Sequence, residues 1–230
     1  DVNAKTNVYA AYKEYFLAPT PYQLFDGTNG NRNLKPETGH EWSVGVHHKF
    51  GKTWNSNLSF FSRSTKDKIG WATNPATGTD QYQNFDTEKA HGINADVRKQ
   101  LTKHLSARLG YTYTHIDATP TRKANRDGYV PKHAVNAGLD YNDAKWDAHL
   151  DIRGVIDRPG TAANIFPRTT YWITDVSANY RVRENVTVFG RINNLFDTYY
   201  AEQSSVRWGH AGDWWPGQGR NFRLGVEVTI

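Results

Sequence analysis

The final segment of the chain, Asn221 to Ile230, alternates strictly between apolar and polar residues. Its apolar members are Phe222, Leu224, Val226, Val228 and Ile230. A period of two is typical of a β-strand with one apolar and one polar face. The length suits a tilted strand that crosses a hydrocarbon layer, and a strand of a soluble sandwich has the same pattern. The recurrence of the pattern and the connections between its copies therefore decide the fold class.

The alternation recurs along the chain and predicts about ten strands. Their cores are expected in 6–16, 40–50, 54–69, a long segment that ends near 97, 105–113, 135–141, 146–152, 172–180, 186–192 and 221–230. The connections alternate between short turns and long polar loops, with the long ones at 17–39, 73–81, 118–131, 157–168 and 196–219. An up-and-down barrel places all short turns at one rim and all long loops at the other. Greek-key crossings in a sandwich give no reason for such sorting.

Aromatic residues stand beside the short turns, on the apolar faces of the strands. They are Phe50, Trp54, Tyr141, Trp146 and Tyr180. Amphipathic rings gather where hydrocarbon meets headgroups, whereas the strands of a soluble core need no such girdle. We therefore expect an all-β fold, a transmembrane antiparallel up-and-down barrel.

Composition removes several other classes. Hydrophobic residues make up 37% of the chain and the mean hydropathy is −0.76, which suits a barrel with a polar interior and wet loops. No apolar run approaches the roughly 18 residues of a transmembrane helix. Cysteine is absent, so thiol chemistry and cysteine metal sites are excluded. The net charge of +5 is spread evenly, and no basic run favours a nucleic-acid partner.

Catalytic motifs are not found either. The sequence holds no Gly-x-Ser-x-Gly, His-Glu-x-x-His or phosphate-binding loop. His47 and His48 are adjacent, so in a strand they point to opposite faces, which is poor geometry for one metal ion. We expect no enzyme, no cofactor and no metal site. The chain begins without Met and without a signal-peptide pattern, so we expect it to be part of a longer protein.

Several short motifs resemble the TonB-dependent outer-membrane receptors, over essentially the whole chain. They are Tyr9–Tyr12, Phe16–Thr20, Asn33–Thr38, Asp67–Ile69, Tyr111–Thr114, Asn193–Tyr200 and Gly219–Phe222. The family has a barrel of about 22 strands with a plugged lumen, so the resemblance implies that residues 1–230 are the C-terminal half of such a barrel. The plug, its TonB-coupling box and the other strands would lie upstream. The family usually ends in an aromatic residue, and Ile230 departs from that pattern.

The resemblance implies capture of a scarce ligand by the long loops and import with energy from the TonB complex. Outer-membrane lipid and lipopolysaccharide are then expected neighbours. Aromatic rings and Arg suit an anionic aromatic ferric chelate, which makes a ferric siderophore the expected ligand. The candidate ligand-binding residues are Tyr22, Trp71, Tyr82, Arg207, Trp208, His210, Trp214 and Trp215.

Other ligands and roles stay open. Haem receptors of the family commonly carry a His between the two N-terminal boxes, and the interval 20–33 has Tyr22 but no His, which leaves His210 as a possible axial ligand. Cobalamin is a third ligand. A passive porin or a structural barrel is an alternative without a plug.

Charged residues on the polar face would contact the plug. They are Asp151, Arg153, Arg191, Arg223 and Glu227. A network between neighbouring strands is the alternative role of these side chains. About ten strands from a larger barrel leave two open edges, so we expect that this piece alone does not form a sealed transporter.

Overall fold

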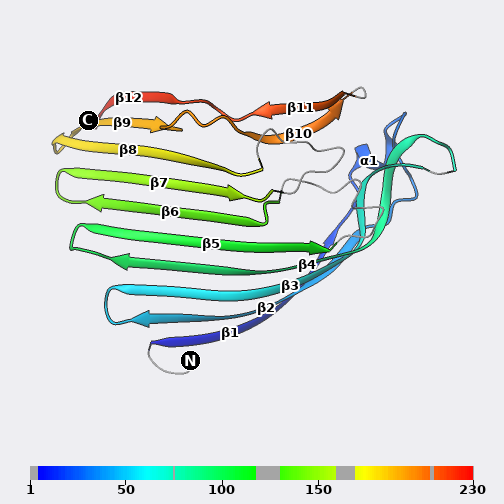
Figure 1. The fold of residues 1–230 in the computed structure, drawn as a ribbon, viewed down its shortest axis with the longest axis horizontal. Helices are drawn as coiled ribbons and strands as arrows, with labels where there is room; N and C mark the ends of the chain where they lie inside the picture. Colours follow the sequence, from blue (N-terminus) through cyan, green and yellow to red (C-terminus); the bar gives the residue numbers. More distant parts are fainter. Residues whose placement is uncertain (1–4, 75, 118–129, 159–168, 208–209, 230) are drawn as a thin grey trace.

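The computed structural model describes residues 5–74, 76–117, 130–158, 169–207 and 210–229, with only the backbone described at 71, 86, 203–207 and 210–214. Nearly all regular structure is β (Figure 1). The elements are β1 (Thr6–Leu17), α1 (Pro21–Phe25), β2 (Glu37–Phe50), β3 (Trp54–Thr73), β4 (Asp80–Gln100), β5 (Leu105–Asp117), β6 (His133–Asn142), β7 (Trp146–Ile156), β8 (Tyr171–Arg183), β9 (Val186–Asn193), β10 (Ala201–Arg207), β11 (His210–Pro216) and β12 (Asn221–Val228). Among the described residues, no helix has the length and apolar character needed to cross a membrane.

The main sheet has ten antiparallel strands in the order β1 to β9 followed by β12. This confirms the predicted all-β fold and the predicted strand number. The short turns lie together at one end of the strands, and the longer connections lie at the other end (Figure 1). Within the described residues, β10 and β11 pair with each other and with no other strand, so the final long loop carries a hairpin of its own.

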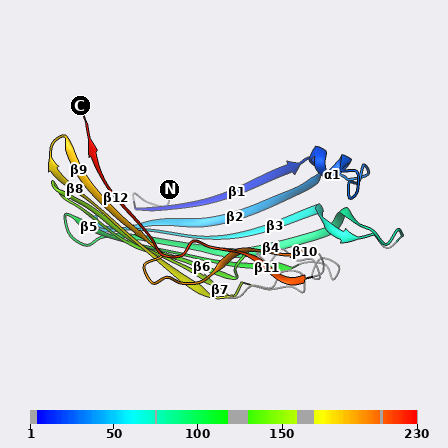
Figure 2. The same ribbon diagram turned by 90° about the horizontal axis from the view of Figure 1, so that it is seen from above.

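The two faces of the sheet differ as the alternation predicts. One row across β2, β3 and β4 joins Val46, Leu58 and Ala95, and the next row joins Gly45, Ser59 and Asn94. The sheet is bowed like a trough (Figure 2). On the apolar face, side chains are widely exposed, and Leu224 is 81% exposed. On the polar face, Ser106 is 5% exposed. Because side chains converge on the inside of a bow, we identify the polar face as the inner wall of a barrel.

Two elements formed where only loops were expected. Helix α1 begins at a capping box, in which Thr20 and Gln23 bond each other's backbone, and Pro21 occupies its first turn. The β10–β11 hairpin lies inside the segment 196–219. A small core joins its base to the inner wall: Tyr200 packs against Tyr171 and Ile173 of β8.

Candidate ligand and lumen sites

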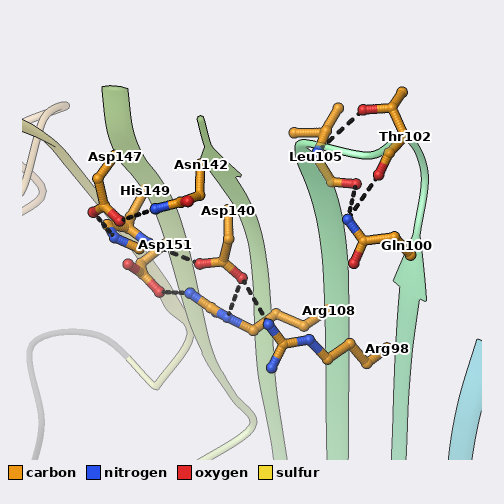
Figure 3. A network of polar contacts seen from close by, with 10 residues as sticks. All are labelled: Arg98, Gln100, Thr102, Leu105, Arg108, Asp140, Asn142, Asp147, His149 and Asp151. Carbon is orange, nitrogen blue, oxygen red and sulfur yellow. Dashed lines mark hydrogen bonds and ion pairs between the residues drawn. The ribbon is translucent and has the colours of Figure 1, made fainter. Parts of the chain in front are cut away.

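A cluster of charged side chains lies on the inner wall near the short turns (Figure 3). We call it the lumen cluster; its members are Arg98, Arg108, Asp140, Asp147, His149 and Asp151. Asp140 of β6 receives Arg108 Nε at 3.5 Å and Arg98 Nη2 at 4.0 Å. Arg108 also reaches Asp151, so one guanidinium bridges carboxylates of β6 and β7. The cluster therefore ties β4, β5, β6 and β7 together across the sheet.

His149 completes the charge balance of the lumen cluster. Its Nδ1 lies 2.8 Å from Asp140 Oδ1 and its Nε2 lies 2.7 Å from Asp147 Oδ1. A neutral imidazole has one N–H, so both contacts are hydrogen bonds only when both nitrogens are protonated. With His149 charged, three cations face three carboxylates in the cluster. The lumen cluster is then neutral as a whole, which suits a wall-stabilising role.

Gly138 gives Arg108 its path across the wall. A Cβ at position 138 would overlap the guanidinium of Arg108, which lies over this part of β6. The absence of a side chain there lets the arginine extend from β5 to Asp151 on β7. Beside it, a depression of about 300 Å³ is lined by Arg98, Arg108 and Asn136 together with apolar residues such as Val97 and Leu109.

A second inner-wall site holds the base of the final hairpin. Arg158 is buried, and its Nη2 donates to the Ala201 carbonyl at 2.6 Å. Arg153 Nη2 lies 3.3 Å from Glu202 Oε1, and its guanidinium carbon lies 6.0 Å from the ring centroid of Tyr200. The start of β10 is thus bonded to β7, through Arg153, and to the segment that follows β7, through Arg158.

The turn between β9 and this hairpin has its own fastening. Asn194, with φ of 51°, is buried. Its Nδ2 donates to the carbonyls of Thr198 (2.9 Å) and Gln218 (3.1 Å), and its Oδ1 accepts from the Thr198 amide at 2.8 Å. Asp197 Oδ1 accepts from the amide of Arg220 at 2.8 Å. These bonds join the segment that leaves β9 to the segment that enters β12, and so define the root of the final loop.

The predicted lumen residues share the inner wall. Asp151 and Arg153 lie on β7, and each has a partner within this chain, Arg108 and Glu202 respectively. Arg191 and Arg223 stand directly opposite each other on β9 and β12, and Glu227 stands opposite Thr187. Their contact with a plug stays a prediction.

At the long-loop rim, the first loop and the β3–β4 hairpin form an aromatic corner, which we define as Tyr22, Phe25, Arg32 and Tyr82. The rings of Tyr22 and Tyr82 meet edge to face, with centroids 6.2 Å apart. The guanidinium carbon of Arg32 lies 5.4 Å from the ring centroid of Phe25. Tyr22 and Phe25 are 62% and 61% exposed. The corner thus presents open aromatic surface beside a cation.

The predicted ligand residues divide into two groups. Tyr22 and Tyr82 meet in the aromatic corner, and the register places Trp71 opposite Tyr82. The others belong to the final loop. Arg207 ends β10, while His210, Trp214 and Trp215 lie on β11, where Trp215 is exposed; Trp208 lies outside the described residues.

Phe25 and Arg32 were not predicted as site residues. The capping box after Thr20 was a usable signal, since it predicts a helical turn that brings Tyr22 and Phe25, three residues apart, to one face. In the part of the chain that the structure describes, no group of His, Asp and Glu is arranged to hold a metal ion.

Residues 1–195 match the family model described as TonB dependent receptor-like, beta-barrel. The chain is 27% identical to the iron-regulated outer membrane virulence protein of Vibrio cholerae serotype O1, over 93% of this chain and 34% of that protein. It is 26% identical to the vitamin B12 transporter BtuB of Vibrio vulnificus, over 94% of this chain and 33% of that protein.

A solved structure agrees in fold. A mutant of the ferric enterobactin receptor of Pseudomonas aeruginosa superposes with a TM-score of 0.77 at 18% identity, covering 100% of this chain and 39% of that one. The chain spans about a quarter to a third of the length of the curated relatives it matches.

Proposed function

Because the chain belongs to the TonB-dependent receptor-like β-barrel family of the outer membrane, we propose that it is part of an active-transport receptor. The receptor captures a ferric siderophore at the long-loop rim and imports it with energy from the TonB complex. The observation that carries this proposal is the aromatic corner, in which Tyr22 and Tyr82 meet and Phe25 lies beside Arg32.

The chemistry of the aromatic corner supports a flat anionic ligand. Exposed rings offer stacking surface, and Arg32 adds a delocalised cation that stacks on aromatic planes and pairs with oxygen anions. A ferric chelate with aromatic, negatively charged arms uses both features at once. Exposed apolar side chains that lie side by side in one patch also mark ligand-binding or partner-binding surfaces.

The names of the relatives support transport and differ in cargo. One is an iron-regulated outer membrane protein, another a ferripyoverdine receptor of Pseudomonas aeruginosa, 24% identical to this chain, and a third a vitamin B12 transporter. Cobalamin is therefore the second candidate ligand. Haem is a weaker candidate, because its expected ligand position in the first loop holds Tyr22.

For the inner wall, we propose that a plug contacts the exposed residues Arg191, Arg223 and Glu227, together with the exposed atoms of Asp151 and Arg153. The lumen cluster, to which Asp151 belongs, balances its own charges. It is therefore suited to keep the wall fixed while a neighbouring plug moves.

The test uses the full-length receptor purified in detergent and measures binding of a ferric catecholate siderophore, cobalamin and haemin. Tight binding of the ferric siderophore is expected. Double replacement of Tyr22 and Phe25 by Ala should weaken it at least about tenfold, since each ring contact contributes on the order of 1 kcal/mol. Phe16→Ala, an exposed aromatic at the end of β1 outside the corner, is the matched control. If the receptor bound cobalamin but not the ferric siderophore, the proposal would be contradicted. Ion conductance of the receptor in a bilayer without TonB would also contradict it.

A further inference from the structure

The alternation of side chains between the two faces of β3 is interrupted at Asp67, before the β3–β4 hairpin extends beyond the main sheet. Lys66 and Lys68 are two apart, so regular alternation would place them on one face. Instead Lys66 lines the outer face beside Phe16, while Lys68 points to the inner wall, where its Nζ lies 2.6 Å from Oε1 of the buried Glu88. Asp67 has φ of 54°, a left-handed conformation that Asp tolerates better than most residues. The inversion therefore places Lys68 on the face opposite to the one that regular alternation predicts.

Two side chains hold the inversion in place. Asn84 Nδ2 donates to the Asp67 carbonyl at 2.6 Å, and Glu37 Oε1 accepts from the Ile69 amide at 2.9 Å. Asn84 also accepts from the Lys35 amide at 2.7 Å and donates to the Lys35 carbonyl at 2.9 Å. The two sequence boxes 33–38 and 67–69 therefore meet in space, with Asn84 between them. We call this set of contacts the latch.

Between the latch and the tip of the β3–β4 hairpin, the first loop covers the unpaired edge of β4. β4 pairs with β5 only as far as Lys89, so its preceding residues have no strand on that side in the described structure. The loop supplies the missing hydrogen bonds. Asn29 Nδ2 donates to the Asp80 carbonyl at 2.6 Å, Asn31 Nδ2 donates to the Tyr82 carbonyl at 2.8 Å, and the Asn29 carbonyl accepts from the Tyr82 amide at 3.2 Å.

These contacts join two segments that are far apart in the sequence and that each carry one ring of the aromatic corner. Tyr22 belongs to the first loop and Tyr82 to the β3–β4 hairpin, and their edge-to-face contact exists only while the two segments keep their relative position. A site whose parts are fixed before the ligand arrives binds without the entropic cost of ordering them.

We propose that Asn84 and Glu37 are positioning residues of the ligand site. Through the latch they make the first loop and the β3–β4 hairpin one preassembled unit that presents Tyr22 and Tyr82 to a flat anionic aromatic chelate. The identity of the ligand rests on the proposed function; the preassembly rests on the contacts alone.

The experiment compares Asn84→Ala and Glu37→Ala with the wild-type full-length receptor. Asn33→Ala is the matched control, because Asn33 is an exposed residue of the same loop that contributes no side-chain bond to the latch. Hydrogen exchange without ligand is followed at the amides of Lys35, Ile69 and Tyr82. Siderophore affinity and the thermal unfolding of the barrel are measured on the same samples.

Each latch variant should speed exchange in both segments by about tenfold or more, since the side-chain hydrogen bonds that hold the backbone of Lys35, Asp67 or Ile69 are lost. Ferric siderophore affinity should fall by a similar factor while barrel unfolding stays unchanged, and Glu37→Gln, which keeps the acceptor oxygen, should restore both. Exchange as slow as in Asn33→Ala would overturn the inference, and so would faster exchange with unaltered affinity. If the wild type binds no ferric siderophore, the proposed function fails, and the exchange data still decide whether the latch preassembles the corner.

Discussion

We expect Asn194→Ala to open the root of the final long loop while the barrel stays folded. Asn194 is 2% exposed and holds φ of 51°. Its side chain bonds Thr198 through both the amide and the carbonyl of that residue, and it bonds the Gln218 carbonyl as well. The replacement removes these bonds and places Ala in a left-handed conformation.

The magnitude follows from the contacts. Three hydrogen bonds at about 1 kcal/mol each give about 3 kcal/mol. Left-handed backbone adds roughly 1 kcal/mol for Ala. A sum of about 4 kcal/mol corresponds to a local opening equilibrium raised about a thousandfold. Asn194→Gly avoids the backbone strain, so the increase should be about two hundredfold.

The assay is hydrogen exchange at the amide of Arg220 in the full-length receptor. This amide bonds Asp197 Oδ1, which none of the replacements alters, so its exchange reports opening of the turn. Asn185→Ala, in the tight turn between β8 and β9 at the opposite rim, is the control and should leave Arg220 unaffected.

The order of the variants carries the test. Exchange at Arg220 should increase from the wild type to Asn194→Gly, and again from Asn194→Gly to Asn194→Ala. An Asn194→Ala receptor whose Arg220 amide exchanges within a factor of about three of the wild type would refute the reasoning, because the three bonds would then contribute almost nothing to the root.

Other consequences follow from the same structure. Leu58→Arg, on the outer face, should cost about 2–4 kcal/mol in refolding into bilayers, whereas Ser59→Arg on the inner wall should cost far less; urea titration measures both. Gly138→Ala should displace Arg108 from Asp151, seen as a changed Arg108 ¹⁵Nε signal, with at most about 1 kcal/mol lost because the ion pair is partly exposed. The hydroxyl of Tyr141 and two amides lower the pKa of Asp143 from 3.8 to about 2. Because the folded value is the lower one, the turn keeps this stabilisation above about pH 4 and loses it as pH falls through 2; amide protection in the turn should follow that profile and become independent of pH in Asp143→Asn.

The sequence predicts the sheet well because each strand records its two environments in alternate residues. Leu58 lies on the outer face and Ser59 on the inner face, as expected. The short turns lie together at one end of the strands, as their lengths indicate. Nearest-neighbour pairing then leaves little choice, since each short turn joins adjacent antiparallel strands. The number and order of the ten strands in the main sheet therefore follow from periodicity and turn length, whereas the separate β10–β11 hairpin does not.

The site follows less completely, because its contacts join segments that are distant in the sequence. Alternation continued through Asp67 puts Lys68 on the wrong face, and only the observed backbone angle reveals the inversion. Likewise, aromatic content identified Tyr22 and Tyr82 as candidates but gave no reason for them to meet. That meeting depends on Asn84, a residue with no motif of its own beyond its place in β4.

The turn at the tip of the β3–β4 hairpin lies beyond the latch and projects from the molecule (Figure 1). It is closed by its own backbone, with the Asn74 amide bonded to the Thr79 carbonyl and the Gly78 amide bonded to the Asn74 carbonyl. A foreign peptide inserted between Asn74 and Thr79 would therefore project from the molecule at the end of a hairpin whose base is held by the latch. This makes the tip a natural grafting point for displaying epitopes or affinity tags on a cell surface without redesign of the barrel.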